Sequence, residues 1–175
     1  FDQLLQFSDK TDEQIYKRED TVNYLDKVIS EYISTALATP NLNVNISQAL
    51  SSYYLMLVDI ERISDYAVNM NHQATKRLQG DMTISEIEII EHMKKLCEDM
   101  KNDLDDVEEA ERKDDVIDSL VSSWREAQIQ ALKQKKCSSE VSMMLSRIFT
   151  DFERINDHAL NVSQELDKIT FEIPD

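Results

Sequence analysis

The sequence predicts an all-α protein made of two tandem antiparallel three-helix bundles, in which the first helix of the first bundle is truncated. Two observations support this fold class. The chain of 175 residues contains one Gly and two Pro. So few turn-forming residues are typical of long helices joined by short loops. In addition, one stretch occurs twice: residues 59–70 read DIERISDYAVNM and residues 151–162 read DFERINDHALNV. A repeat of this kind predicts the same structural unit twice.

The two stretches lie 92 residues apart and share seven of their twelve positions. Glu61, Asp65 and Asn69 follow one another at intervals of four, which places them on one ridge of a helix. The second copy repeats this ridge with Glu153, Asp157 and Asn161. An adjoining apolar stripe at helical spacing is also repeated, so the carboxylates are expected at the margin of a buried face. The stripe consists of Tyr53, Met56, Ile60, Ile63, Ala67, Met70 and Ala74, and of Leu145, Ile148, Phe152, Ile155, Ala159, Val162 and Leu166.

In the first half, residues 1–8 resemble the end of a helix. A second helix is expected over residues 11–37, with Thr11 and Gln14 as a capping box at its start. Pro40 and the Asn-rich residues after it end this helix. The first motif helix is expected to begin near residue 46 and to close at Gly80. Repeat one is therefore assigned to residues 1–80.

Repeat two is assigned to residues 81–175. Its first helix is expected to be capped by Thr83 or Ser85, and the acidic stretch that follows either continues as helix or kinks near Asp103. A further helix leads to the second motif helix over residues 138–169. Residues 1–8 correspond only to residues 93–100, so most of the first helix of repeat one is missing. Together with a first residue, Phe1, that is not Met, this indicates a fragment of a longer protein.

Composition excludes several classes of function. The net charge of −16 argues against nucleic-acid binding, which needs Lys and Arg to neutralise phosphates, and against docking on anionic lipid. No apolar run is long enough to insert into a membrane. Cys97 and Cys137 have no metal-ligand spacing. We see no group of residues that would form a catalytic nucleophile with its base. The Glu-x-x-His pairs of ferritin-like enzymes do not occur in the sequence either. We therefore expect no enzymatic activity.

The carboxylate ridges require a positive partner. Carboxylates four residues apart on a helix repel each other by ~0.2–0.5 kcal/mol even when exposed, and the cost rises near a buried face. One alternative is an arginine, such as Arg62 or Arg154, or a lysine from a neighbouring helix. The other is a metal ion, which the recurrence of the ridge favours.

At the motif, both stretches resemble the duplicated ERIxDxxxN signature of PhoU-domain proteins, and the resemblance covers nearly the whole chain. Residues 124–162 are similar to the PhoU-like region at the C-terminus of bacterial Na/Pi cotransporter-family proteins. The resemblance implies two three-helix bundles side by side, motif carboxylates that bind metal clusters, and a regulatory role in phosphate transport and phosphate homeostasis. One departure within the repeat is Tyr66, which stands where the second copy has His158.

The resemblance also implies a set of metal ligands on the motif helices and on the helices before them. All are oxygen donors, which suits hard ions such as Mg²⁺, Ca²⁺, Mn²⁺ or oxidised iron; zinc is a further occupant in the family. The expected ligands are Glu61, Asp65, Glu19, Asn23 and Asp26 in repeat one, and Glu153, Asp157, Glu111, Asp115 and Asp118 in repeat two. The expected supporting residues are Arg62, Arg154, Asn69, Asn161 and His158, the arginines either orienting the ridge carboxylates or pairing with Asp59 and Asp151.

A groove is expected where the truncated helix is missing, lined by Ile15, Val22, Leu25 and Ile29. Leaving such side chains uncovered costs ~1.5–3 kcal/mol each, so the groove marks an interaction surface. Either a helix upstream in the parent chain fills it, or another subunit does, as in a homodimer. The resemblance favours the first option. It implies the cytoplasmic domain of a Na/phosphate cotransporter-family protein, tethered to the inner face of the cell membrane through an upstream transport domain. The alternatives are a free-standing PhoU-like regulator of a separate phosphate transporter and a metal-free helical adaptor.

Overall fold

The computed structural model describes residues 1–77 and 84–172, and in these ranges it contains six α-helices and no strand. This confirms the predicted all-α class. The helices are α1 (Asp2–Leu5), α2 (Asp9–Leu37), α3 (Val44–Arg77), α4 (Ile84–Asn102), α5 (Val107–Lys133) and α6 (Ser139–Glu172). The predicted repeat boundary at residue 80, the helix end at Gly80 and the cap at Thr83 lie outside the described residues. The alternative cap, Ser85, lies inside α4.

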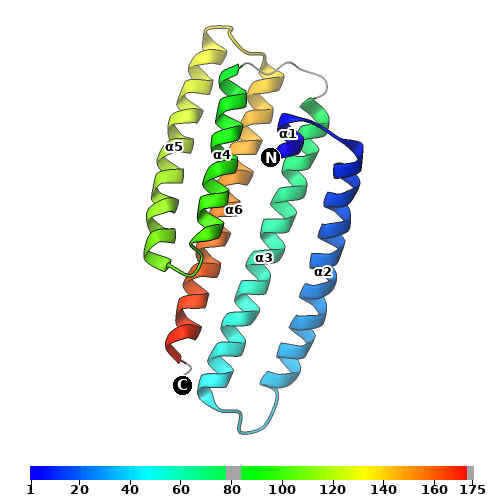
Figure 1. Ribbon diagram of the computed structural model, residues 1–175, viewed down its shortest axis with the longest axis vertical. Coiled ribbons are helices and arrows are strands. Elements are labelled where there is room, and N and C mark those ends of the chain that lie inside the picture. The colour runs from blue at the N-terminus through cyan, green and yellow to red at the C-terminus, as the bar shows by residue number, and fades with distance from the viewer. Residues whose placement is uncertain (78–83, 173–175) are drawn as a thin grey trace.

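The two motif helices, α3 and α6, form the centre of the molecule and run in opposite directions (Figure 1). They make the most extensive contact between any two described helices. On the outer sides, α2 pairs with α3, and α5 pairs with α6. The remaining helices lie in front of this layer in the view of Figure 1: α4 contacts α5 and α6, whereas the short α1 contacts α3 and α4. Each half is therefore a helical hairpin with a third helix packed on it.

The starts of α2 and α5 are set by side-chain contacts that the sequence does not reveal. The N-cap of α2 is Ser8, not Thr11. The side chain of Gln3, which is buried, holds the backbone of Ser8: the Ser8 N–H donates to Gln3 Oε1 (2.7 Å) and Gln3 Nε2 donates to the Ser8 carbonyl (3.0 Å). The acidic stretch is not one continuous helix. The chain breaks at Asp103, where a kink was the predicted alternative, and it reverses direction there: α4 ends at Asn102, residues 103–106 form a turn, and Asp106 caps α5 by accepting the backbone N–H of Glu109 (3.1 Å).

The core is concentrated in repeat two. Phe149, Phe152 and Ile148 of α6 are fully buried, together with residues of α4 and α5. The prediction that the whole apolar stripe is buried in both repeats is wrong, because Tyr53 and Ile60 of α3 are each 44% exposed. The physical reason is the size of the third helix: α4 has 19 residues, whereas α1 has four and reaches only part of α3.

Over the ranges that the structure describes, no helix is both long and apolar enough to span a lipid bilayer.

Candidate functional site

The ridge of repeat one lies on α3 beside α2. Arg62 contacts both ridge carboxylates, with its Nε 3.7 Å from Glu61 Oε2 and its Nη1 3.9 Å from Asp65 Oδ2. Burial, followed by the negative charge of Asp65, raises the pKa of the Glu61 carboxyl. Asp26 and Glu19 of α2 act in the same direction. Arg62 does not cancel this effect, so the ridge and α2 share an excess of negative charge.

Asn23, a further expected ligand, is exposed and directed along its own helix. Its Nδ2 donates to Glu19 Oε1 at 2.6 Å. This bond restrains the Glu19 carboxylate on α2, and Asn23 is thereby engaged within the helix rather than with the ridge on α3.

The ridge of repeat two is neutralised differently. Glu153 forms an ion pair with Arg125 of α5, and both side chains are about two-thirds buried. Arg154 contacts Asp157 at 3.1 Å. The two motif arginines thus orient the ridge carboxylates, which was one of the two roles expected for them. Sequence reasoning missed Arg125 because its counterpart in repeat one is Ile33, so no shared pattern marked it.

Sequence reasoning also missed Asp114. This partly buried carboxylate on α5 has an Oδ1 without a hydrogen-bond partner. Burial, followed by the charges of Asp118, Asp157 and Asp115, raises the pKa of Asp114 to about 6. Asp118, Asp115 and Asp157 therefore all lie in the electrostatic neighbourhood of Asp114. Glu111, another expected ligand, instead accepts a hydrogen bond from Gln164 of α6 (3.3 Å).

The supporting residues join α3 to α6. His158 Nδ1 lies 2.7 Å from Asp59 Oδ1, and Asn161 Nδ2 donates to the same oxygen at 3.1 Å. The His158 ring stacks on Tyr66, its counterpart in repeat one, with ring centroids 5.8 Å apart. Asp59 is thus held by His158 and Asn161, not by Arg62. Asn69 lines a surface pocket of about 320 Å³ with Asp151.

The model of the PhoU domain family matches residues 2–74 and 87–166. The chain belongs to the PhoU domain family. This PhoU domain is 22% identical over 165 residues to the phosphate-specific transport system accessory protein PhoU homolog 1 of Thermotoga maritima, covering 87% of this chain and 70% of that protein. Its fold matches the crystal structure of PhoU from Pseudomonas aeruginosa with a TM-score of 0.85 and 17% identity, over 98% of this chain and 86% of the other.

The expected metal ligands of this PhoU domain fit a cation by chemistry but are not gathered around a point. In the part of the chain that the structure describes, no three His, Cys, Asp or Glu side chains lie close enough together to hold a metal ion. The donors are nevertheless oxygens, which suit hard cations. Arginine pairing is the form of charge compensation that the structure shows, and metal binding stays a prediction.

Proposed function

We propose that this PhoU domain regulates phosphate transport and phosphate homeostasis and carries out no catalysis. The observation that supports this role is the family match across both repeats, residues 2–74 and 87–166. A relative that matches most of the chain is, by its name, an accessory protein of a phosphate-specific transport system. A phosphate transporter, in the same chain or separate, is therefore the partner we propose.

We infer further that the domain is the cytoplasmic part of a Na/phosphate cotransporter-family protein, held at the inner face of the membrane by a transport domain upstream. The support is the similarity of residues 124–162 to the PhoU-like region of such proteins. The alternative is a free-standing regulator that acts on a separate transporter.

Uptake of radiolabelled phosphate tests this role. Cells that express the parent protein with and without the PhoU domain are compared at low and at high external phosphate. Regulation predicts that removal of the domain changes the uptake rate or its response to phosphate, and that the domain supplied as a separate chain restores part of the response. Equal uptake by both proteins under all conditions, at equal protein levels, would contradict the proposal.

A second candidate function is binding of a hard cation at the ridge of repeat one. The observation that favours it is the raised pKa of Glu61. This shift is caused by burial and by the neighbouring carboxylates of Asp65, Asp26 and Glu19. A cation there would offset the repulsion that Arg62 leaves. In repeat two, Arg125 already pairs with the ridge carboxylate Glu153, and the carboxylate that stays under-compensated is Asp114 of α5. Mg²⁺, Mn²⁺, Ca²⁺ and ferric iron suit such oxygen donors.

A further inference from the structure

Repeat two has a surface cavity of about 260 Å³ between α4, α5 and α6, beside the turn that joins α5 to α6. Two alanines of α5, one helical turn apart, help to form it, because their short side chains leave space between α5 and α4. Most of the lining is apolar, as is typical of small-molecule sites. The apolar lining residues are Ile89, Trp124, Ala127, Ala131, Leu145 and Phe149.

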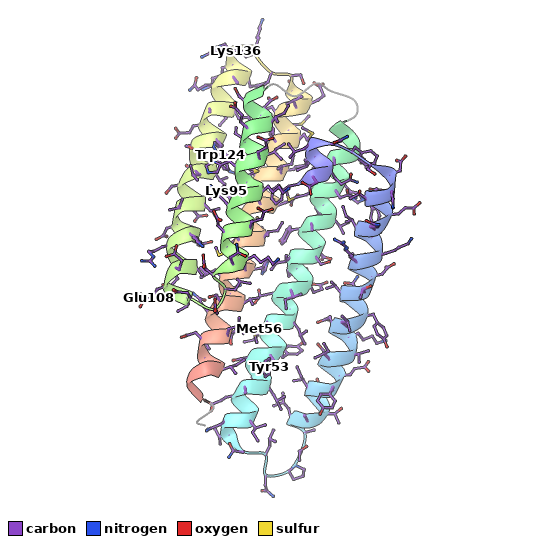
Figure 2. All side chains as sticks on the ribbon, in the orientation of Figure 1. Tyr53, Met56, Lys95, Glu108, Trp124 and Lys136 are labelled. Atoms are coloured by element: carbon purple, nitrogen blue, oxygen red, sulfur yellow. The ribbon has the colours of Figure 1, made fainter. Side chains whose placement is uncertain are left out.

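The turn beside this cavity carries positive charge, although the chain as a whole has a net charge of −16. Residues 127–139 contain three lysines and no acidic residue. Lys133 lies in the last turn of α5, where it complements the helix dipole. Lys135 and Lys136 lie beyond the helix end, and within the described part of the chain neither forms an ion pair. Lys136 lines the cavity itself, and Figure 2 shows it at the end of the bundle, beyond Trp124.

Backbone hydrogen bonds hold this turn in one conformation. The N–H of Lys135 donates to the Leu132 carbonyl (3.0 Å), and the N–H of Lys136 donates to the Ala131 carbonyl (2.9 Å). Lys135 has a φ of 56°, in the left-handed region that usually favours Gly at a helix end. In the equivalent turn of repeat one, which carries no charge, the left-handed residue is Asn41, a type that tolerates this conformation. The lysines are therefore particular to repeat two, and the helix end itself does not require them.

We propose that this cavity binds a small anionic amphiphile, that is, a molecule with a compact aliphatic body and one carboxylate, such as a medium-chain fatty acid. Its body packs against Trp124 and Phe149, and this apolar contact provides most of the affinity. Its carboxylate stays at the solvent-exposed edge, where Lys136 and Lys135 attract it. Glu86 of α4 also lines the cavity but is only 8% exposed. Its negative charge disfavours a carboxylate deeper in the cavity and so fixes the orientation of the ligand.

The test uses the full chain and sodium octanoate as the probe. Trp124 is the only tryptophan of the chain, so its fluorescence reports on the cavity directly, and octanoate should shift its emission in a saturable way. Octylammonium has the same body and the opposite charge, and it should bind about threefold to tenfold more weakly. Cys137 lines the cavity, so saturating octanoate should also slow its reaction with a thiol reagent, which mass spectrometry of the labelled peptide measures.

Substitutions separate the two parts of the site. Ala131→Leu and Ala127→Leu each fill the cavity from α5, and each should weaken octanoate binding about tenfold or more. Gln130→Leu is the matched control, because it adds the same side chain to α5 at a position that does not line the cavity, and it should bind octanoate as the unaltered chain does. The double variant Lys135→Gln, Lys136→Gln should lose the preference for octanoate over octylammonium.

Three results would overturn the proposal. The first is the absence of a saturable change in Trp124 emission at millimolar octanoate. The second is unchanged octanoate binding by both alanine variants, once circular dichroism shows that they are folded. The third is equal affinity of the unaltered chain for octanoate and octylammonium. Vesicles of anionic phospholipid should leave the emission unchanged, and a shift with vesicles but not with octanoate would overturn a free acid as the occupant.

Discussion

Asp59 and Asp151 occupy equivalent positions in the two repeats, yet they differ in their partners. Asp59 accepts hydrogen bonds across the α3–α6 interface from Asn161 and from the His158 ring. At the position equivalent to His158, repeat one has Tyr66, and among the described residues no hydrogen bond to the Asp151 side chain is found. Burial, only partly opposed by Arg147, raises the pKa of Asp151 to about 6. Of two carboxylates at equivalent positions, Asp59 is therefore compensated by hydrogen bonds, whereas Asp151 is not.

Asp151→Asn is expected to stabilise the protein at pH 7. Because the folded state binds the Asp151 proton more tightly than the unfolded chain, its favourable contribution is complete below about pH 4 and is lost as the pH rises through about 6. A shift of this size corresponds to ~3 kcal/mol at full burial, and solvent screening of this partly exposed group reduces the expected gain to about 1 kcal/mol. Urea unfolding at pH 5.5 and pH 7.5 measures it. Asp59→Asn, the matched control, should destabilise, and a loss of stability in Asp151→Asn at pH 7.5 would contradict the assignment.

His158→Ala should destabilise the α3–α6 interface. The variant leaves Asp59 without one of its partners and removes the stack on Tyr66, for an expected loss of about 1–3 kcal/mol. Tyr66→Phe keeps the ring and should change the free energy of unfolding by no more than ~0.5 kcal/mol. A double-mutant cycle of His158→Ala with Asp59→Asn isolates the pair. Additive effects of these two substitutions would show that the contact is not formed in solution.

Phe152→Ala and Ile60→Ala are expected to have very different costs despite their equivalent positions. Phe152 is fully buried, and its truncation should cost about 3–5 kcal/mol. Ile60 is 44% exposed, so its truncation should cost about 1 kcal/mol or less. Chemical denaturation of both variants makes the comparison. A cost for Ile60→Ala close to that of Phe152→Ala would mean that the Ile60 side chain is covered in solution.

Glu61→Gln should separate the two explanations of the ridge. In chelator at pH 7 we expect it to raise the free energy of unfolding by ~0.2–0.5 kcal/mol, because it relieves the repulsion from Asp65. With millimolar Mn²⁺ the unaltered chain should melt at a higher temperature than without metal, whereas Glu61→Gln combined with Asp65→Asn should show no shift.

Glu153→Gln is the control for the metal experiment, since its carboxylate is engaged by Arg125, and it should keep the shift. No metal in elemental analysis, together with unchanged melting of the unaltered chain under several ions, would favour the metal-free adaptor.

The sequence was a good guide to features that recur at regular spacing. The apolar stripe and the ridge repeat together, and they predict the starts of the two motif helices to within three residues. The start of α2 was misplaced, since its position depends on Gln3, whose side chain folds back onto the Ser8 backbone. Such a contact involves no repeated pattern. The sequence leaves the break before α5 as one of two alternatives, because the stretch has no Gly or Pro to decide it.

In the candidate site, too, the sequence does not reveal features that are absent from one of the two repeats. Reasoning from the repeat favours positions that carry polar residues in both copies, and so it identifies Glu61 and Glu153 but misses groups whose counterparts are apolar. Arg125 corresponds to Ile33 and Asp114 to Val22, and both were therefore invisible to it. The truncated first helix predicts that some residues of repeat one are exposed. It does not predict that Ile60 is one of them, because this depends on how far α1 extends along α3.

The central pairing of α3 with α6 has a consequence for the order in which the chain folds. Within each hairpin, α2 with α3 and α5 with α6, the partners are joined by a short turn, so their contacts close small loops. The α3–α6 contact joins residues about 92 apart, such as Tyr66 and His158, and closing so long a loop is entropically costly and slow. We expect the hairpins to form early. Because α3 and α6 make the most extensive contact in the described structure, we expect each hairpin to become stable only when the two hairpins pack together. The duplicated halves would then unfold together, as one cooperative unit, although each carries its own copy of the motif.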